Sequence, residues 1–185
     1  EIDGQLARLD AEFEIIKDAE DNLYGYSDGT QLLLHSFGNV RGGEMLGALG
    51  TYLLVPKEYE VAISAALGEY VEGVVFTNSD RVDASLDILI EKTARGAIFP
   101  LDAIIPPKQI KIDITRAPGG EKAIIGIASE IIKYPDQYRK VVELLLGHVI
   151  VVADRNAARD LLDSGQWQSL PGLRVVTLYG ELFSV

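Results

Sequence analysis

The residues that could perform acid–base or metal chemistry are few and scattered along the chain. The only histidines, His35 and His148, each stand alone beside an apolar run, and there is no cysteine. A metal site or a catalytic triad needs several such side chains at suitable spacing, so core or edge packing is the favoured interpretation of both histidines. Gly43, Gly47 and Gly50 fit neither the phosphate-binding loop nor the dinucleotide-binding pattern. The sequence therefore predicts no catalytic, metal or cofactor site.

Basic side chains that could contact phosphates gather in one local cluster. It comprises Lys108, Lys111, Arg116 and Lys122. Interleaved acids such as Asp113 and Glu121 favour a solvated loop face, with weak and steeply salt-dependent DNA binding as the alternative. A second basic group follows at Lys133, Arg139 and Lys140, again with acids between its members.

The composition is that of a globular domain. With 185 residues and 48% hydrophobic residues the chain can bury a core, so one domain with a tail is expected. The net charge of −11 argues against tight nucleic-acid binding by the chain as a whole. No apolar run reaches the roughly 18 residues that a membrane span requires. The lack of cysteine fits a reducing compartment, and a first residue Glu1 without a signal-peptide pattern leads us to expect a fragment of a longer protein.

A heptad pattern predicts a coiled-coil arm over residues 1–24. Its apolar positions are Ile2, Leu6, Leu9, Phe13, Ile16 and Leu23, spaced mainly by four and three. An ordinary amphipathic surface helix would give much the same pattern. Residues 1–22 hold eight acids against two bases, however, which favours a helix that needs a partner strand from outside this chain. The arm is expected to end at a group of turn-forming residues, Asn22, Gly25, Ser27, Asp28 and Gly29.

Two segments of the chain, residues 54–68 and 133–147, match each other at a fixed offset. The match pairs Pro56 with Pro135, Tyr59 with Tyr138, Leu67 with Leu146 and Gly68 with Gly147. Each copy predicts a helix, because proline suits the first turn and glycine suits the left-handed position just past the end. The positions Tyr59, Ile63 and Leu67, or Tyr138, Val142 and Leu146, are expected to form one buried face.

The match extends beyond these helices and predicts the fold class. A short apolar segment containing glycine precedes each helix, a strand follows it at 74–77 or 149–153, and a second helix comes next, at about 79–94 or 154–163. We therefore expect a mixed α/β fold with two similar subdomains, 25–105 and 106–185, each a small sheet with helices. The link between the repeats is expected to hold a strand at 110–114.

With its paired Pro-x-x-Tyr helices ending in Leu-Gly, the sequence resembles the hinge domain of the SMC (structural maintenance of chromosomes) family, ATPases of chromosome condensation and cohesion. The resemblance covers nearly the whole chain. Its further motifs are Leu46-Gly-Ala-Leu-Gly-Thr51, Gly126-Ile-Ala-Ser-Glu130, and the segments 22–26, 95–102 and 174–181, the last as a closing strand and turn. The order and spacing of these motifs carry the resemblance.

The resemblance implies a half-ring that pairs with its copy into a closed, twofold ring. This homodimer would join two coiled-coil arms in the cytoplasm at the nucleoid, while the ATPase heads and the returning arm lie outside this chain. Edge strands of the two sheets could pair with the partner's other subdomain. Gly126, Ile127 and Ala128 are candidate dimer-interface residues because small residues permit close approach, and packing inside their own subdomain is the alternative. In the bacterial pattern a glycine-rich segment follows the closing strand, whereas this chain stops at Val185.

Two other functions stay open on the sequence alone. One is a small α/β enzyme or ligand-binding domain with a cleft between the repeats, which would show converging polar groups with shifted titrations. The other is a nucleic-acid-binding domain, which would show binding that falls steeply with salt.

Overall fold

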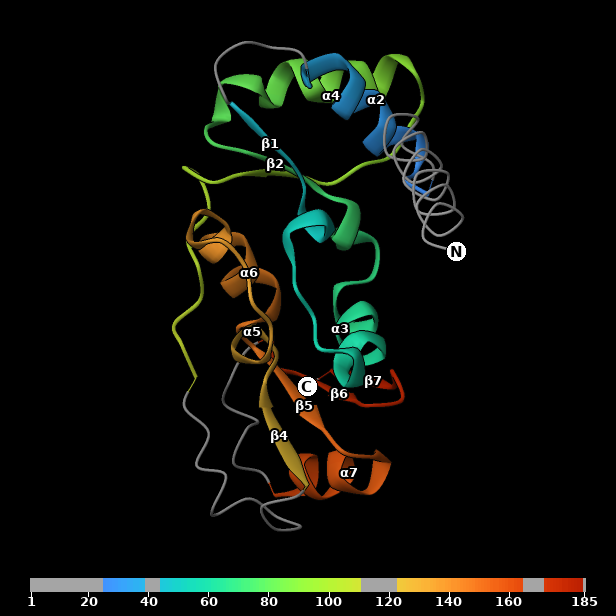
Figure 1. Ribbon diagram of the computed structural model, residues 1–185, viewed down its shortest axis with the longest axis vertical. Helices are drawn as coiled ribbons and strands as arrows, with labels where there is room; N and C mark the ends of the chain where they lie inside the picture. The colour runs from blue at the N-terminus through green and yellow to red at the C-terminus, as the bar shows by residue number, and fades with distance from the viewer. Residues whose placement is uncertain (1–24, 39–43, 111–122, 165–171, 185) are drawn as a thin grey trace, which may run out of the picture.

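The computed structural model describes residues 25–38, 44–110, 123–164 and 172–184, which form two small sheets with helices between and outside them (Figure 1). The first sheet has the order β1-β2-β3, with strands β1 (Met45–Ala48), β2 (Val74–Phe76) and β3 (Ile98–Pro100). The second has the order β4-β5-β6-β7, with β4 (Ile124–Ile127), β5 (Val149–Val152), β6 (Arg174–Thr177) and β7 (Leu182–Ser184). The expected mixed α/β class is confirmed.

The helices form three layers along the long axis of the molecule (Figure 1). The outer face of the first sheet is covered by α2 (Asp28–Phe37) and α4 (Val82–Glu91), and the outer face of the second by α7 (Arg155–Asp163). Between the sheets lie α3 (Glu60–Leu67), α5 (Ala128–Ile131) and α6 (Arg139–Leu146). Short 3₁₀ turns complete the chain: η1 (Leu49–Tyr52), η2 (Lys57–Tyr59), η3 (Gly68–Glu72), η4 (Ser79–Arg81) and η6 (Asp136–Tyr138).

Strands β2 and β5 are apolar at every position because both of their faces are buried. In β2, Val74 and Phe76 pack outward against α2 and α4, while Val75 packs inward. In β5, Ile150 and Val152 pack outward against α7, while the alternate residues pack inward. This alternation follows from the two-residue period of a strand, and it explains why the sequences of β2 and β5 are hydrophobic without interruption.

The internal repeat is confirmed in detail. Four consecutive elements, β1, η1, η2 and α3, recur as β4, α5, η6 and α6 with bounds 79 residues further along, from Met45 to Ile124 and from Leu67 to Leu146. In both copies the first strand pairs antiparallel with the second, and the second pairs parallel with the third. The equivalent residues Leu54 and Lys133 pair with each other through two backbone hydrogen bonds of 2.8 and 3.0 Å, so the pseudo-twofold axis passes between them.

The helices of the two repeats are exchanged between the sheets. The Tyr138 hydroxyl, at the start of α6, donates to the carbonyl of Leu46 on β1 at 2.8 Å. In turn α3 contacts β6, and a Cβ placed on Gly180, in the turn after β6, would lie 3.1 Å from Val61 Cγ1. The largest apolar cluster accordingly combines residues of both repeats. Neither repeat has a complete core without the other. The division into subdomains 25–105 and 106–185 therefore describes the two sequence repeats and stays a prediction.

Two local expectations from the sequence are wrong. Asp28 and Gly29 do not end a helix but begin α2, after the N-cap residue Ser27. Glycine is required at position 29 because a Cβ there would lie 1.9 Å from the carbonyl oxygen of Arg95, so the helix packs directly on backbone. Gly147 is right-handed, with φ −66°, whereas Gly68 has the expected positive φ of 54°. The difference arises because the chain after Gly68 enters η3, while the chain after Gly147 turns almost at once into β5.

Three predictions fall largely outside the described residues. The coiled-coil arm at 1–24 lies wholly outside them, and so does all but the first residue of the strand at 110–114. That first residue, Ile110, is 6% exposed and packs in the apolar cluster under α7. Of the basic cluster, Lys108 alone lies in the described part of the chain.

Candidate dimerisation edges

Among the residues that the structure describes, the second sheet has one strand more than the first. In the second sheet, β7 turns back after β6 and pairs with it antiparallel. In the first sheet β3 is the equivalent of β6, and within the described ranges no strand lies beside it on the outer side. Both sheets therefore end in an edge strand, β3 in one and β7 in the other, and an edge offers backbone groups to a further strand.

The ladder geometry identifies the backbone groups at these two edges. On β3, the backbone groups of Ala97 and Leu101 face β2: Val74 N donates to Ala97 O at 2.9 Å, and Leu101 N donates to Phe76 O at 2.9 Å. Because backbone direction alternates along a strand, the backbone N–H and C=O of Ile98 face away from β2. Next to β7, Thr177 N donates to Glu181 O at 3.0 Å, so the backbone of Glu181 faces β6. The backbone N–H and C=O of the next residue, Leu182, therefore face away from β6. The Leu182 side chain is 43% exposed. Ile98 and Leu182 thus mark the positions where an added strand would bond.

Of the predicted interface residues, Gly126 and Ile127 end β4, the opposite edge strand of the second sheet, and Ala128 begins α5. Gly126 pairs with Val151 at the bulge of β4 and is half-buried. The side chains of Ile127 and Ala128 are 5% and 0% exposed and pack in two apolar clusters of the chain itself. A contact of this segment with a partner would therefore have to use backbone atoms, and it stays a prediction.

The basic residues are spread rather than gathered in the described part of the chain. The Lys108 carbonyl accepts a hydrogen bond from His148 Nε2 at 2.8 Å, and its side chain is exposed. In the second group, Arg139 is paired with Asp136 and the Lys140 ammonium donates to Leu101 O at 2.8 Å. His148 therefore ties the link between the repeats to the start of β5, as the packing interpretation of this histidine expects.

One arginine that the sequence analysis did not single out joins the two central helices. Arg174, the first residue of β6, donates from Nη1 to Ala66 O at 2.8 Å and from Nη2 to Leu145 O. Ala66 and Leu145 are equivalent in the repeat, and they lie in the last turns of α3 and α6, where carbonyls need donors. Burial lowers the pKa of Arg174 by desolvation. No local sequence signal could have revealed this contact, because it joins three elements that are distant along the chain.

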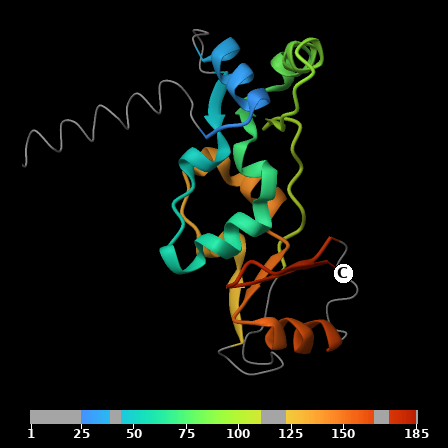
Figure 2. The same cartoon turned by 90° about the vertical axis from the view of Figure 1, so that its right-hand side faces the viewer.

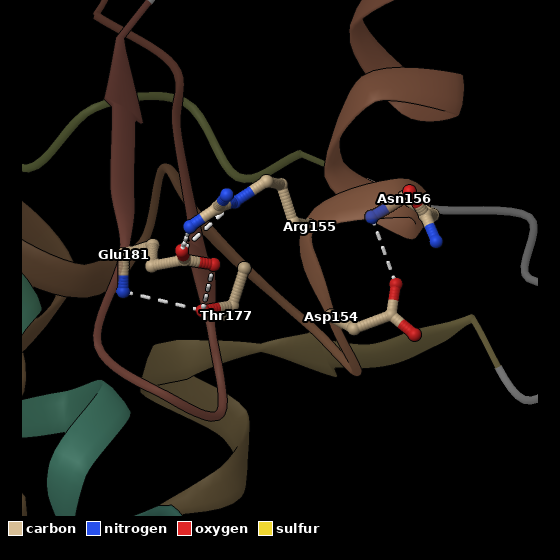
Figure 3. Close-up of polar contacts among 5 residues, drawn as sticks. All are labelled: Asp154, Arg155, Asn156, Thr177 and Glu181. Carbon is tan, nitrogen blue, oxygen red and sulfur yellow. Dashed lines mark hydrogen bonds and ion pairs between the residues drawn. The ribbon is translucent and has the colours of Figure 1, made fainter.

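Each repeat carries a polar pair that fixes the turn after its third strand. In the first, Ser79 N and Oγ donate to the Asp102 carboxylate at 3.1 and 2.7 Å. In the second, Arg155 Nε donates to Glu181 Oε1 at 2.9 Å, and Arg155 Nη2 donates to the same oxygen (Figure 3). These hydrogen bonds lower the pKa of Asp102 and of Glu181 below their ordinary values. Carboxylates with lowered pKa values are weak bases, so the pairs suit a structural role.

The grooves within the described residues do not bring catalytic groups together. The groove between the repeats is lined by α3 and the turn before β7, and its polar side chains are Glu60, Ser64 and Tyr179. Within the described structure no hydrogen bond joins the Ser64 hydroxyl to Glu60 or Tyr179, and the described residues contain no cluster of three metal-ligating side chains. The alternative of an enzyme or ligand-binding domain with a cleft between the repeats therefore gains no support. Among the helices that the structure describes, none is long and apolar enough to cross a membrane.

Comparisons with known sequences and known structures agree on one protein family. The family model described as SMC proteins Flexible Hinge Domain matches residues 42–162. The chromosome partition protein Smc of Desulfitobacterium hafniense (strain Y51) is 29% identical over 185 residues, which are 98% of this chain and 15% of that protein. The corresponding Smc protein of Mycoplasma genitalium is 31% identical over 138 residues, which are 74% of this chain and 14% of that protein.

Solved structures agree with the sequence matches. An asymmetric dimer of the Geobacillus stearothermophilus SMC hinge domain matches with a TM-score of 0.81 and 28% identity, over 95% of this chain and 69% of that one. The Pyrococcus furiosus SMC hinge domain matches with a TM-score of 0.64 and 23% identity, over 93% of this chain and 83% of that one, and shows the shared fold. This chain spans only 14% to 15% of the two Smc proteins named above.

Proposed function

The chain belongs to the family of SMC flexible hinge domains, and we propose that it pairs with a second copy of itself by joining the β3 edge of each copy to the β7 edge of the other. The observation that carries the proposal is the unequal number of strands that the described residues give to two otherwise repeated sheets. The place beside β3, which β7 fills in the second sheet, would be taken by β7 of the partner. Two such junctions related by a twofold axis would satisfy both edges in a closed assembly.

The positions of the two edges support this pairing. In Figure 2, β3 is the last strand of the first sheet toward the right-hand side, and β7 ends toward the same side. The pairing requires a partner that reaches both edges at once. The solved Geobacillus stearothermophilus hinge domain is itself a dimer. Pairing both edges would produce two continuous sheets, each running from one copy into the other.

Light scattering over a range of protein concentrations tests the proposal. We expect a mass near twice the 20.2 kDa of the chain. The variant Leu182→Pro removes the outward amide hydrogen of β7 and should yield a folded monomer, since proline is tolerated on an edge. The matched variant Leu182→Ala keeps that amide and should still dimerise. A monomeric wild type at every concentration, or a folded Leu182→Pro dimer, would contradict the pairing.

Weak contact with DNA is the second candidate function, favoured by the exposed Lys108. The proposed site is Lys108, Lys111, Arg116 and Lys122, of which the last three lie outside the described residues. With four cations, affinity should fall steeply between about 50 and 200 mM salt. Fluorescence anisotropy with single- and double-stranded DNA measures this, and no binding at about 50 mM salt would remove the proposal.

The rest of the assignment concerns the longer protein of which we propose this chain is a part. We infer that the domain itself catalyses no reaction, and that the ATPase heads and the returning arm belong to other segments. We further infer a cytoplasmic protein associated with the nucleoid. Purified chain should then hydrolyse no ATP above background, whereas an ATPase activity that copurifies with the folded domain would contradict the inference.

A further inference from the structure

The Arg174 guanidinium lies on the pseudo-twofold axis that relates the repeats. Its two hydrogen bonds end on Ala66 O and Leu145 O, which are the same position in the two copies. A planar guanidinium can donate from two nitrogens in fixed directions, so one side chain joins the C-terminal ends of α3 and α6. Both helix ends also carry partial negative charge, which suits a cation there.

Each of the two helices touches one of the proposed dimerisation edges. The first turn of α3 packs on the turn that leads into β7, where Val61 contacts Gly180. The first turn of α6 contacts the chain just after β3, where Lys140 Nζ donates to Leu101 O at 2.8 Å. A continuous path of contacts therefore runs from the β7 edge through α3, Arg174 and α6 to the β3 edge.

The other end of the axis is joined separately. Leu54 and Lys133, which precede the two helices, bond to each other through their backbones. Among the described residues, the repeats are thus joined on the axis by a backbone bridge at one end and by the Arg174 side chain at the other. The side-chain contact is the one that a substitution can remove without altering the backbone ladder.

We propose that Arg174 is a positioning residue for dimerisation, which holds the β3 and β7 edges at the spacing that a second copy requires. The proposal rests on the edge pairing proposed above. Once one edge has paired, the second pairs within the same complex, and the strength of that step depends on how well the spacing is maintained. Arg174 acts through the two helices and need not contact the partner itself.

The test compares dimer dissociation constants, measured by sedimentation on folded protein. Arg174→Met keeps much of the side-chain length and removes both hydrogen bonds, and we expect at least a tenfold weaker dimer. The control Leu161→Ala empties a fully buried position in the apolar cluster under α7, which contains no residue of α3 or α6 and leaves the contacts of Arg174 in place. It should lower stability by at least as much and leave the dissociation constant within about twofold, because additivity holds for distant sites. Equal dissociation constants for wild type and Arg174→Met would overturn the proposal while leaving the edge pairing intact.

A disulfide rescue separates positioning from a general loss of stability. Leu54 and Lys133 form a hydrogen-bonded antiparallel pair, whose Cα atoms lie about 5.5 Å apart, within disulfide range. Cysteines at both positions would be the sole cysteines of the chain. In the Arg174→Met background, oxidation should restore the dimer toward wild-type affinity, and reduction should reverse the gain. An oxidised protein that still dimerises as weakly as the reduced one would overturn the proposal, and a monomeric wild type would overturn the edge pairing first.

If Arg174→Met fails to fold, Arg174→Lys supplies the same comparison. A single ammonium can reach one of the two carbonyls, so we expect an intermediate loss of affinity, with faster amide exchange at the end of one helix. A lysine variant with wild-type affinity and wild-type exchange at both helix ends would contradict the role of the two-pronged contact.

Discussion

The two repeats of this chain are nearly identical where they face each other and different where they face outward. The strand, turn and helix that form the contact between them have matching bounds in both copies. The differences lie at the periphery. The first repeat alone has η3, whose Glu72 carboxylate accepts from Ser27 N at 2.7 Å and so ties down the start of α2. Within the described ranges, the second alone has a strand such as β7. The comparison indicates that the packing of the two repeats against each other fixes the geometry they share. The outer differences hold the start of α2 in the first repeat and provide the edge strand β7 in the second.

The two equivalent tyrosines offer the largest contrast. Tyr138 is fully buried, stacks on Tyr52 with ring centroids 4.8 Å apart, and donates to Leu46 O, whereas Tyr59 is half-buried. We expect Tyr138→Ala to lower the free energy of unfolding by about 4 kcal/mol and Tyr59→Ala by about 1.5 kcal/mol. Urea denaturation of both variants measures the difference. Equal losses of unfolding free energy would contradict this account, because they would show that the two tyrosines contribute equally to the packing.

Asp154, the N-cap of α7, accepts more hydrogen bonds than Asn78, the N-cap of the turn η4 that leads into α4. Asp154 Oδ1 accepts from Asn156 N at 2.9 Å and from Ala157 N at 3.0 Å, while Asn78 accepts from Asp80 N at 3.1 Å (Figure 3 shows Asp154). Asp154→Ala should cost about 1.5 kcal/mol and Asn78→Ala about 0.7 kcal/mol of unfolding free energy. Thermal unfolding followed by circular dichroism ranks the two, and the reverse order would contradict this account of the caps.

The backbone conformations just after α4 and α7 lead us to expect a stabilising glycine substitution after α4 only. Thr93, just after α4, has φ 55°, a left-handed conformation that is costly for a β-branched residue. Thr93→Gly should raise the free energy of unfolding by about 1 kcal/mol. The control is Ser164→Gly after α7, where φ is −63° and glycine should give no gain. Stabilisation by both substitutions would mean that strain at Thr93 is not the cause.

The two polar turn pairs should respond differently to salt. The pKa of Glu181 is lowered chiefly by the hydrogen bond from the charged Arg155 and further by its charge, and that of Asp102 by hydrogen bonds from the neutral Ser79. Both folded pKa values lie below the ordinary values of 4.5 and 3.8, so each contribution to stability is present above the ordinary value and is lost as the pH falls below it. In about 1 M salt, NMR titration should show the pKa of Glu181 moving up toward its ordinary value while that of Asp102 stays lowered. Equal movement of both would contradict the distinction.

Much of the fold could be predicted from the repeated helix, because its proline, tyrosine and glycine mark both ends and the buried face. The exchange of helices between the sheets could not, since the same apolar face would fit either sheet. The start of α2 was hidden because Gly29 resembles a helix breaker, and only the approach of the Arg95 carbonyl explains it. Likewise, the sequence identifies Gly126 as a small edge residue, but the β3 edge is found only from the structure, where no described strand of the first repeat corresponds to β7.

Amide hydrogen exchange at Ile98 and Leu182 tests the central claim most directly. These are the outward-facing amides of the two edges, and each should exchange quickly in dilute monomer and slowly in dimer. The account predicts that protection of both amides rises together as protein concentration crosses the dimer dissociation constant. If the mass doubles while both amides exchange as fast as in the monomer, the copies associate through another surface and the edge pairing is wrong.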